Sequence, residues 1–313
     1  MPKLEPTKQI KLSKKVLQEI LQNYNLALHS YKEASSGIEN TTALVVTNKG
    51  KFAVRIYQKN KKKISTIQLE LEFMNYLAKY DLPVPKVINN AKGQLITQHK
   101  DTKATWQCIC MELMPGAHIA KYTPQLIKEL AATQAKIHKL GIVFAKNRKV
   151  NPTTIRLADK EFLPKINLSK IKNREIKEFL LRDKSFIVKL DDKLPRGFNH
   201  NDFDHGNILV KNNKLSAVLD FDDLSYAPMA MCLGYTLWAV LFETQSFGQV
   251  RQYVKEYSKV RKLNQLELKS LRNIILFRHY VIGAQNILFN GEKTKDTKTF
   301  LKLEKQLIKT SVI

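Results

Sequence analysis

Five aspartates that lie close together constrain this chain more than any other feature. They are Asp202, Asp204, Asp220, Asp222 and Asp223. They fall within 22 residues of a chain whose formal net charge is +25, and packing alone gives no reason to concentrate carboxylates there. The apolar segments 208–210 and 215–219 lie among them and are joined by Lys211-Asn212-Asn213-Lys214, which predicts a β-hairpin with carboxylates at both ends of its strands.

One end of this hairpin would carry Asp202 and Asn207, and the other would carry Asp220. Carboxylate and amide oxygens suit Mg²⁺ that is bound together with substrate phosphates. The pattern H-x-D-x-x-x-x-N that begins at His200, followed by D-F-x, resembles the catalytic and metal-binding loops of the protein-kinase-like phosphotransferases. Gly206 before Asn207 makes it most similar to the small-molecule branch, which includes aminoglycoside phosphotransferases, choline kinases and type II homoserine kinases.

The resemblance implies a role for three residues. Asp202 would accept the proton of the attacking hydroxyl, while Asn207 and Asp220 would hold Mg²⁺ on ATP. It also implies an α+β, bilobal protein-kinase-like fold, with a small N-terminal antiparallel-sheet lobe that has one main helix and a larger, mainly helical C-terminal lobe. We expect the nucleotide-binding lobe at residues 1–112 and the catalytic and substrate-binding lobe at residues 113–313. A polar turn between two strands is the alternative interpretation of the motif.

The first third of the chain carries a second part of the resemblance. Apolar positions over 16–24 predict a helix, and residues 43–46 and 52–57 predict a strand hairpin. The preceding sequence G-I-E-N-T is similar to the nucleotide-positioning loop of homoserine-kinase-type members, so Gly37 and Asn40 are expected to contact ATP. Gly37 would let backbone N–H groups approach phosphate closely, although a tight turn without a ligand is compatible with the same residues.

Arg55 stands where the family usually carries the lysine that holds the α- and β-phosphates, and arginine is bulkier and bidentate. Glu70, on a helix expected over residues 65–80, fits as its partner. An ordinary surface arginine and glutamate are the alternative. The strand predicted over 106–114 leads into a Pro-Gly that resembles the linker between lobes. The backbone from Glu112 to Met114 would face the adenine, but a plain interdomain linker would look the same.

The basic composition is interpreted as a property of the surface. Lysine accounts for 43 of the 53 basic residues, and these lysines are spread over the whole chain, most densely at residues 59–63. Proteins that bind nucleic acid gather basic residues on one face, so no specific nucleic-acid partner is expected. The apolar stretch 227–242 is too short for a membrane span, and three cysteines are too few for a disulfide framework. With no apolar run that would form a signal peptide, we expect a cytoplasmic location.

Helical spacing dominates the rest of the chain. It predicts helices over 126–137, closed by Gly141, over 229–244 and over 266–288, and a helical insertion at about 160–190. His138 is interpreted as a packed structural residue. Two positions depart from the family pattern, because Cys232 replaces an aspartate that braces the catalytic loop and Asn201 replaces a Gly or Arg without a direct chemical role. We expect an active enzyme with a differently braced loop.

Pro228 follows Asp220 by only eight positions, whereas a protein kinase needs a long segment there to present a peptide. The expected reaction is transfer of the γ-phosphoryl group of ATP to a hydroxyl of a small molecule.

Arg272 and residues 278–280 would be able to hold a carboxylate, unless they form a solvated basic helix face. With the G-I-E-N-T loop, this favours an amino acid or amino alcohol such as homoserine. The alternatives are an aminoglycoside, other antibiotic or sugar kinase, and a nucleotide-binding protein without transfer activity, the latter motivated by Arg55 and Cys232. Asp204 and Asp222 either join the site or are solvated neighbours, and the sequence predicts no oligomeric state.

Overall fold

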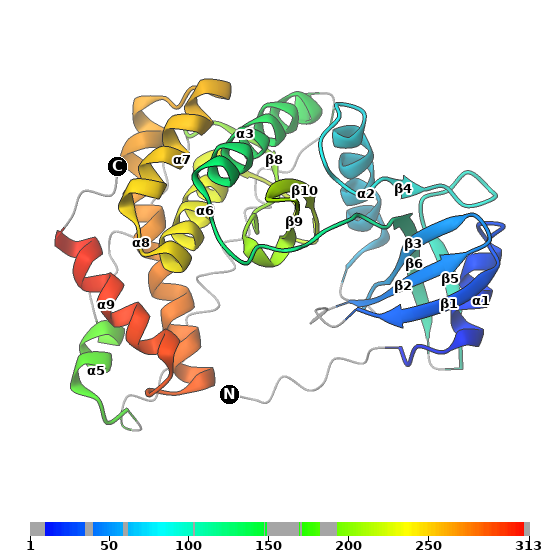
Figure 1. Cartoon of the computed structure of the whole chain (residues 1–313), viewed down its shortest axis with the longest axis horizontal. Coiled ribbons are helices and arrows are strands. Elements are labelled where there is room, and N and C mark those ends of the chain that lie inside the picture. Colours follow the sequence, from blue (N-terminus) through cyan, green and yellow to red (C-terminus); the bar gives the residue numbers. More distant parts are fainter. Residues whose placement is uncertain are drawn as a thin grey trace. The chain divides into compact units, whose positions relative to one another are not determined.

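Figure 1 shows the computed structural model, which describes residues 10–34, 40–58, 62–102, 104–146, 148, 169, 171–181 and 193–309. The chain divides into two compact units, and each is described by itself. Unit 1 comprises residues 1–116 and 216–219, and unit 2 comprises residues 117–215 and 220–313.

Unit 1 is built on a six-stranded antiparallel sheet with the order β1-β2-β3-β6-β4, in which β5 also pairs with β6. The strands are β1 (Leu28–Glu33), β2 (Thr41–Thr47), β3 (Gly50–Ile56), β4 (Val87–Ile88), β5 (Thr97–Lys100) and β6 (Thr105–Glu112). Its helices are α1 (Lys14–Gln22) and α2 (Ile64–Ala78). The expected hairpin and both expected helices are confirmed. Strand β1 was not predicted, because five of its six residues are exposed and show no alternation.

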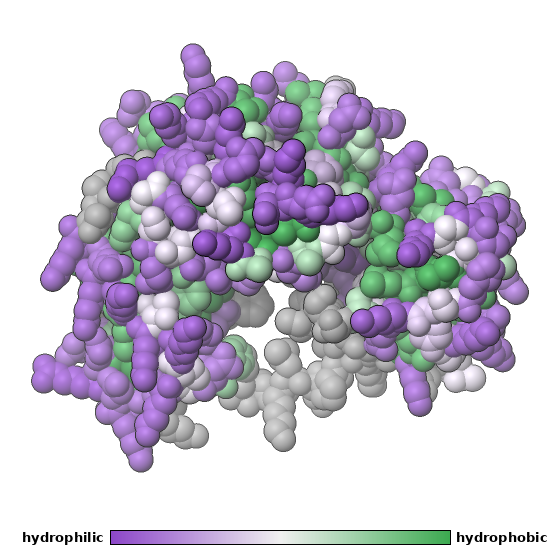
Figure 2. Space-filling model, viewed as in Figure 1, coloured by the Kyte–Doolittle hydropathy of each residue, from purple (hydrophilic) through white to green (hydrophobic). Residues whose placement is uncertain are grey.

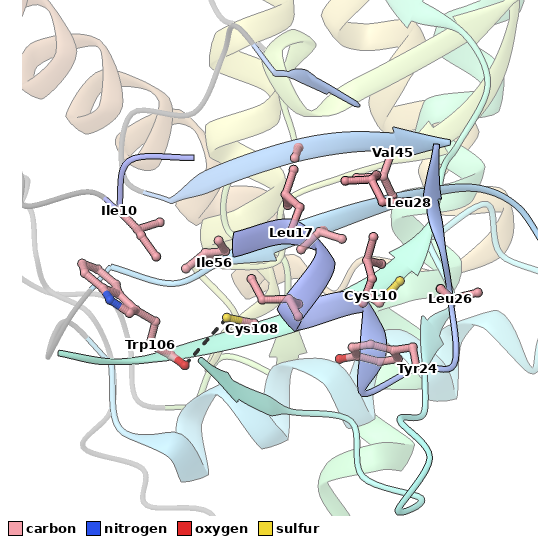
Figure 3. Close-up of a cluster of buried hydrophobic side chains, with 14 residues drawn as sticks. Ile10, Leu17, Tyr24, Leu26, Leu28, Val45, Ile56, Trp106, Cys108 and Cys110 are labelled. Atoms are coloured by element: carbon pink, nitrogen blue, oxygen red, sulfur yellow. Dashed lines mark hydrogen bonds between the residues drawn. The ribbon is translucent and has the colours of Figure 1, made fainter. Parts of the chain in front are cut away.

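Helix α1 covers one face of this sheet. Ser13 caps the helix by accepting a hydrogen bond from the backbone N–H of Val16 at 3.2 Å. The buried side chains of α1 and of the strands form one cluster (Figure 3), with Leu17, Ile20, Leu21, Ala43, Val45, Val54, Ile56, Cys108 and Cys110 at its centre. Burial of each large aliphatic side chain contributes about 1.5–3 kcal/mol relative to exposure. The cluster therefore fixes the sheet, and the two cysteines serve as core residues and are free thiols.

The other face of the sheet meets α2. Side chains alternate along a strand, so Arg55 points away from the face to which Val54 and Ile56 contribute. Arg55 forms an ion pair with Glu70 of α2. The alternation of side chains along β3 and this contact together show that Arg55 and Glu70 lie on the face of the sheet opposite α1.

Unit 2 is mainly helical, in agreement with the expected α+β class. Its described helices are α3 (Pro124–Lys146), α5 (Arg174–Leu181), α6 (Met229–Thr244), α7 (Phe247–Val260), α8 (Gln265–Asn290) and α9 (Lys295–Lys309). Among the helices, α3 packs against α7, and α6 packs against α7 and α8. Its short strands are β7 (Ala117–His118), β8 (Arg196–Asn199), β9 (Ile208–Lys211) and β11 (Ser225–Pro228). Strand β10 (Lys214–Val218), which pairs with β9, begins in unit 2 and ends in the 216–219 segment of unit 1.

The expected end of the helix at Gly141 is wrong, because α3 continues to Lys146. A Cβ at Gly141 would lie 1.8 Å from the backbone oxygen of Phe198 in β8. The glycine is therefore needed where helix and strand approach each other closely, and not for a helix end. His138 in the same helix is fully buried and its Nδ1 lies 2.6 Å from the hydroxyl of Tyr257, as expected for a packed residue. Helices α7 and α9 were not predicted.

The visible surface is largely hydrophilic, as Figure 2 shows for one face of the molecule. No helix in the part of the chain that the structure describes is long and apolar enough to cross a membrane. Most of the apolar stretch at 227–242 lies instead in the buried helix α6, which begins at Met229.

Candidate active site

Two loops of unit 2 are brought together by the pairing of β8 with β11. Asn199 at the end of β8 lies opposite Ser225 at the start of β11. The loop that follows β8 therefore lies beside the loop that precedes β11. Asn201 joins them, since its side-chain amide donates to the carbonyl of Asp223 at 2.9 Å and to Oγ of Ser225 at 2.6 Å. Its backbone is left-handed, with φ of 61°, which asparagine tolerates better than most residues. Asn201 thus positions the loops, a role that the sequence did not reveal.

Asp202 is the carboxylate at the centre of the first loop. The side-chain amide of Asn207 donates to its Oδ2 at 2.8 Å and to its carbonyl oxygen at 2.9 Å. Nη2 of Arg278, on α8, lies 3.5 Å from Oδ1. Partial burial raises the pKa of Asp202, and the nearby negative charge of Asp204 raises it further, while Arg278, His200 and the Asn207 hydrogen bond oppose that rise. The residue is therefore a better proton acceptor than a solvated carboxylate.

The neighbours of Asp202 hold the loop in shape. The backbone N–H of Asp202 donates to Nδ1 of His200 at 3.2 Å, and the fully buried His200 ring lies 4.6 Å from the ring of Phe221. His200 therefore connects the loop after β8 to the D-F-D segment. Asp204 caps the short 3-10 turn η3 (His205–Asn207) by accepting from the backbone N–H of Gly206 at 2.9 Å. This gives Asp204 a local structural role.

Asn207 and Asp220 are the residues that suit a metal ion. Because a carboxylate only accepts hydrogen bonds, the contact with Asp202 identifies the amide nitrogen of Asn207 and leaves its Oδ1 as the atom for a ligand. Asp220 has a left-handed backbone, with φ of 60°, between strand β10 and the buried Phe221. Within the described ranges, no group of three or more His, Cys, Asp or Glu residues is arranged to hold a metal. Two oxygen donors fit Mg²⁺, which takes its other ligands from phosphates and water.

The loop is braced by neutral groups on α6, as the replacement of aspartate by Cys232 led us to expect. Backbone groups of His200 and Asn201 form hydrogen bonds with the Cys232 thiol. Burial raises the pKa of Cys232 to about 12, so the thiol stays protonated at neutral pH. A thiol is a weaker hydrogen-bond acceptor than a carboxylate, and further side chains therefore also hold the loop.

Thr236 supplies the main contact of this brace. Its hydroxyl lies 3.0 Å from the carbonyl oxygen of Phe203, the residue between Asp202 and Asp204. Gln134 of α3 donates to the Thr236 hydroxyl at 2.8 Å, and the Tyr253 hydroxyl donates to the Gln134 oxygen at 2.9 Å. All four side chains are buried. Three helices of unit 2 thus hold one carbonyl of the catalytic loop, although these residues lie far apart in sequence and no short motif marks them.

Unit 1 has its own polar cluster around Glu70, which is 2% exposed. The Tyr57 hydroxyl donates to Oε1 of Glu70 at 3.0 Å, and Nζ of Lys62 donates to Oε2 at 3.2 Å. Nη1 of Arg55 lies 3.9 Å from Oε1. The expected pairing of Arg55 with Glu70 is present, but Lys62 is closer. From the sequence, Lys62 was predicted to belong to a solvated lysine cluster, because lysines at positions 59, 61 and 63 surround it.

The remaining candidates of unit 1 have different surroundings. Asn40 is buried, and its Oδ1 accepts from the backbone N–H of Gln58 at 3.1 Å, so it ties the end of β3 to the start of β2. Glu112 ends β6, and its backbone N–H donates to the carbonyl of Lys86 at 2.9 Å. Met114 follows in the linker and is half-buried. Gly37 lies outside the described residues.

The sheet-and-helix unit, the helical unit and the Asp202–Asn207 loop define a protein-kinase-like phosphotransferase. Residues 30–268 match the model of the phosphotransferase enzyme family, APH, and the chain belongs to this family. A homoserine kinase of Afipia carboxidovorans is 26% identical over 264 residues, which are 82% of this chain and 78% of the relative. A homoserine kinase of Bradyrhizobium diazoefficiens is 25% identical over 265 residues, with the same two shares.

Solved structures agree with the fold. An amicoumacin kinase in complex with AMP-PNP and Ca²⁺ superposes with a TM-score of 0.73 at 18% identity, covering 96% of this chain and 95% of that one. A microcompartment-associated aminopropanol kinase gives a TM-score of 0.62 at 16% identity, covering 95% of each chain. The chain is a small-molecule kinase, and enzymes of this family use ATP and a divalent metal ion to phosphorylate a small hydroxyl compound.

Proposed function

We propose that this kinase transfers the γ-phosphoryl group of MgATP to the hydroxyl of a small amino acid, with homoserine as the first candidate. The observation that carries the proposal is the Asp202–Asn207 pair, with Arg278 beside it, in a chain whose relatives include homoserine kinases. The acceptor would be a compound that carries a hydroxyl near one end and an anionic group near the other.

Asp202 would take the proton of the acceptor hydroxyl. The new bond forms between that oxygen and the γ-phosphorus, and the bond between the γ-phosphorus and the bridging β–γ oxygen breaks, so that ADP leaves with the electron pair. The proton goes to Asp202 and then to solvent. The raised pKa of Asp202 favours this transfer, and the Asn207 hydrogen bond orients the carboxylate.

Asn207 and Asp220 would hold Mg²⁺, because the Asn207 Oδ1 is left for a ligand and the Asp220 carboxylate supplies a second kind of oxygen donor that suits this ion. When bound, the ion would neutralise charge on the phosphates and help to fix their orientation. Positioning and charge stabilisation are the main contributions in phosphoryl transfer.

The residues of unit 1 would bind the nucleotide. Arg55 and Lys62 supply two cations held near Glu70, and either cation is suited to phosphate. Gly37 and Asn40 are assigned to the phosphate-positioning loop by the family resemblance. Since the backbone N–H of Glu112 is engaged with Lys86, the proposed adenine contact falls to the Glu112 carbonyl and the Met114 backbone.

A mass-spectrometric screen tests the proposal. The purified full chain is incubated with MgATP and separate pools of amino acids, amino alcohols, sugars and aminoglycosides, and each acceptor is examined for the gain of one phosphate group. We expect homoserine to be phosphorylated and Asp202→Asn to remove the product. A phosphorylated amino alcohol or aminoglycoside with unmodified homoserine would overturn the substrate assignment, and ATP hydrolysis without any phosphorylated acceptor would overturn the transfer reaction.

A further inference from the structure

Arg278 on α8 differs from the other arginines of its surroundings because its side chain is incompletely satisfied. It is 18% exposed, and its contact with Oδ1 of Asp202 is long, at 3.5 Å. Its Nε is buried and has no hydrogen-bond partner among the described residues. A guanidinium has five N–H donors in a planar fork, so most of the donors of Arg278 are not used by Asp202.

Two other arginines of unit 2 donate hydrogen bonds to groups of the protein itself. Arg261 donates to Oε1 of Glu267 at 2.7 Å and to the hydroxyl of Tyr257 at 3.2 Å, and it is 8% exposed. Arg272, on the same helix as Arg278, donates to the carbonyl of Leu307 at 3.3 Å. Both arginines connect parts of the fold. Arg278 also joins α8 to the loop after β8, but through a long contact of 3.5 Å with Asp202, and partial desolvation of a charge is costly unless a partner compensates for it.

The other members of the sequence 278–280 turn away from Asp202. Nδ1 of His279 lies 3.2 Å from Nε1 of Trp238, and its ring contacts Phe300. The Tyr280 hydroxyl donates to the carbonyl of Leu180 at 3.1 Å. Residues 278–280 were predicted from the sequence to form a carboxylate-binding face. Of these three residues, Arg278 is the one that lies at the loop containing Asp202.

The guanidinium of Arg278 is held by aromatic rings of α6. Its Cζ lies 4.6 Å from the ring centroid of Tyr235 and 6.0 Å from that of Trp238. Such cation–π contacts restrict the plane of the guanidinium without occupying its N–H groups. The fork is thus oriented in advance and retains its capacity for a bidentate partner.

We propose that Arg278 binds the carboxylate of the acceptor and selects hydroxy acids over neutral alcohols. The inference rests on the proposed function. Because Arg278 lies within 3.5 Å of the base, one short acceptor is able to present its hydroxyl to Asp202 and its carboxylate to Arg278. Because their contact is long, Asp202 is a weak partner for Arg278, and the substrate carboxylate takes its place.

The test compares homoserine with homoserine amide, which has a similar shape and no negative charge. We expect the parent enzyme to prefer homoserine by about 10–100-fold in kcat/KM, the range of a charge-assisted hydrogen-bonded pair. Arg278→Gln should bring this ratio close to unity, and Arg278→Lys should restore it in part because a point charge lacks the fork. Arg272→Gln is the matched control on the same helix and should keep the parent ratio. Thermal unfolding of each variant establishes that it is folded.

The ratio separates recognition from an indirect effect. An unchanged ratio in Arg278→Gln would mean that Arg278 does not bind the acceptor carboxylate. If both activities also fall by the same factor, Arg278 acts through Asp202. Either result overturns the inference while homoserine phosphorylation by the parent upholds the proposed function. If the parent phosphorylates neutral acceptors but no carboxylate-bearing one, both proposals are overturned.

Discussion

The carboxylates Glu70 of unit 1 and Asp202 of unit 2 have contrasting surroundings. Glu70 is 2% exposed and is held by a tyrosine hydroxyl and a lysine, with an arginine nearby. Asp202 is 35% exposed and is held by one asparagine amide and by an arginine at 3.5 Å. A carboxylate with its hydrogen bonds satisfied by protein groups positions those groups, whereas a carboxylate with accessible oxygen is able to take a proton. The comparison predicts that substitutions at Asp202 affect chemistry and that substitutions around Glu70 affect binding.

Asp202→Asn gives the largest expected effect. The amide has nearly the same shape but cannot accept the proton, so turnover should fall by about 10²–10⁴-fold, the range for a positioned general base. MgATP affinity should stay close to that of the parent, as measured by calorimetry. Asp204→Asn is the comparison variant, since asparagine also caps a helical turn. It removes a charge that helps to raise the pKa of Asp202, so a loss of turnover much smaller than that of Asp202→Asn is expected. Equal losses in both variants would show that loop integrity and not proton transfer is being measured.

Asp220→Ala is expected to act on the metal instead. Loss of the carboxylate leaves Asn207 as the remaining proposed ligand, whose neutral oxygen holds a cation less strongly. The affinity for MgATP should fall by more than about tenfold, equivalent to more than about 1.4 kcal/mol, and turnover should fall with it. ATP binding without Mg²⁺ is the internal control and should change much less. Calorimetry that gave the same Mg²⁺-dependent affinity in parent and variant would remove Asp220 from the metal site.

Thr236→Val tests the brace under the catalytic loop. The valine has a similar size but cannot donate to the Phe203 carbonyl or accept from Gln134, which would leave buried polar groups unsatisfied at about 1–3 kcal/mol. We expect a lower unfolding temperature together with a lower kcat at saturating substrate, and recovery of both in Thr236→Ser. If the melting temperature falls while kcat is unchanged, Thr236 stabilises α6 without positioning Asp202.

The sequence predicted structure correctly where the pattern is local in the chain. The hairpin between residues 208 and 218, with its Asn-Asn turn, placed Asp202, Asn207 and Asp220 at its ends, because alternation and turn residues act over a few positions. It failed where contacts join distant segments. Gln134 and Thr236 are 102 positions apart, and each resembles an ordinary helix residue until α3 and α6 pack together.

The partners of Lys62 and Arg278 were likewise not predicted from the sequence. Lys62 was interpreted as part of a solvated cluster, although it contacts Glu70 eight residues later. Arg278 was grouped with neighbours that turn to other parts of the fold. A basic residue in a sequence gives its charge but not its partner, since partners are set by the tertiary fold.

The smallest expected effect belongs to Arg55, because Glu70 has two cations beside it. If Arg55 and Lys62 both bind phosphate, Arg55→Ala should weaken ATP binding by about fivefold, equivalent to roughly 1 kcal/mol, since Lys62 retains its shorter contact with Glu70. Lys62→Ala should have a similar effect, and the double variant should lose more than the product of the single losses because both of these cations beside Glu70 are then removed. Lys51→Ala, an exposed lysine on the same strand as Arg55, is the control. Calorimetry with ATP and Mg²⁺ gives the affinities. If Arg55→Ala alone weakens ATP binding as much as the double variant does, Arg55 makes the phosphate contact and Lys62 only orders Glu70. If all variants bind ATP as tightly as the parent does, the cluster around Glu70 stabilises the fold and the proposed nucleotide contact is wrong.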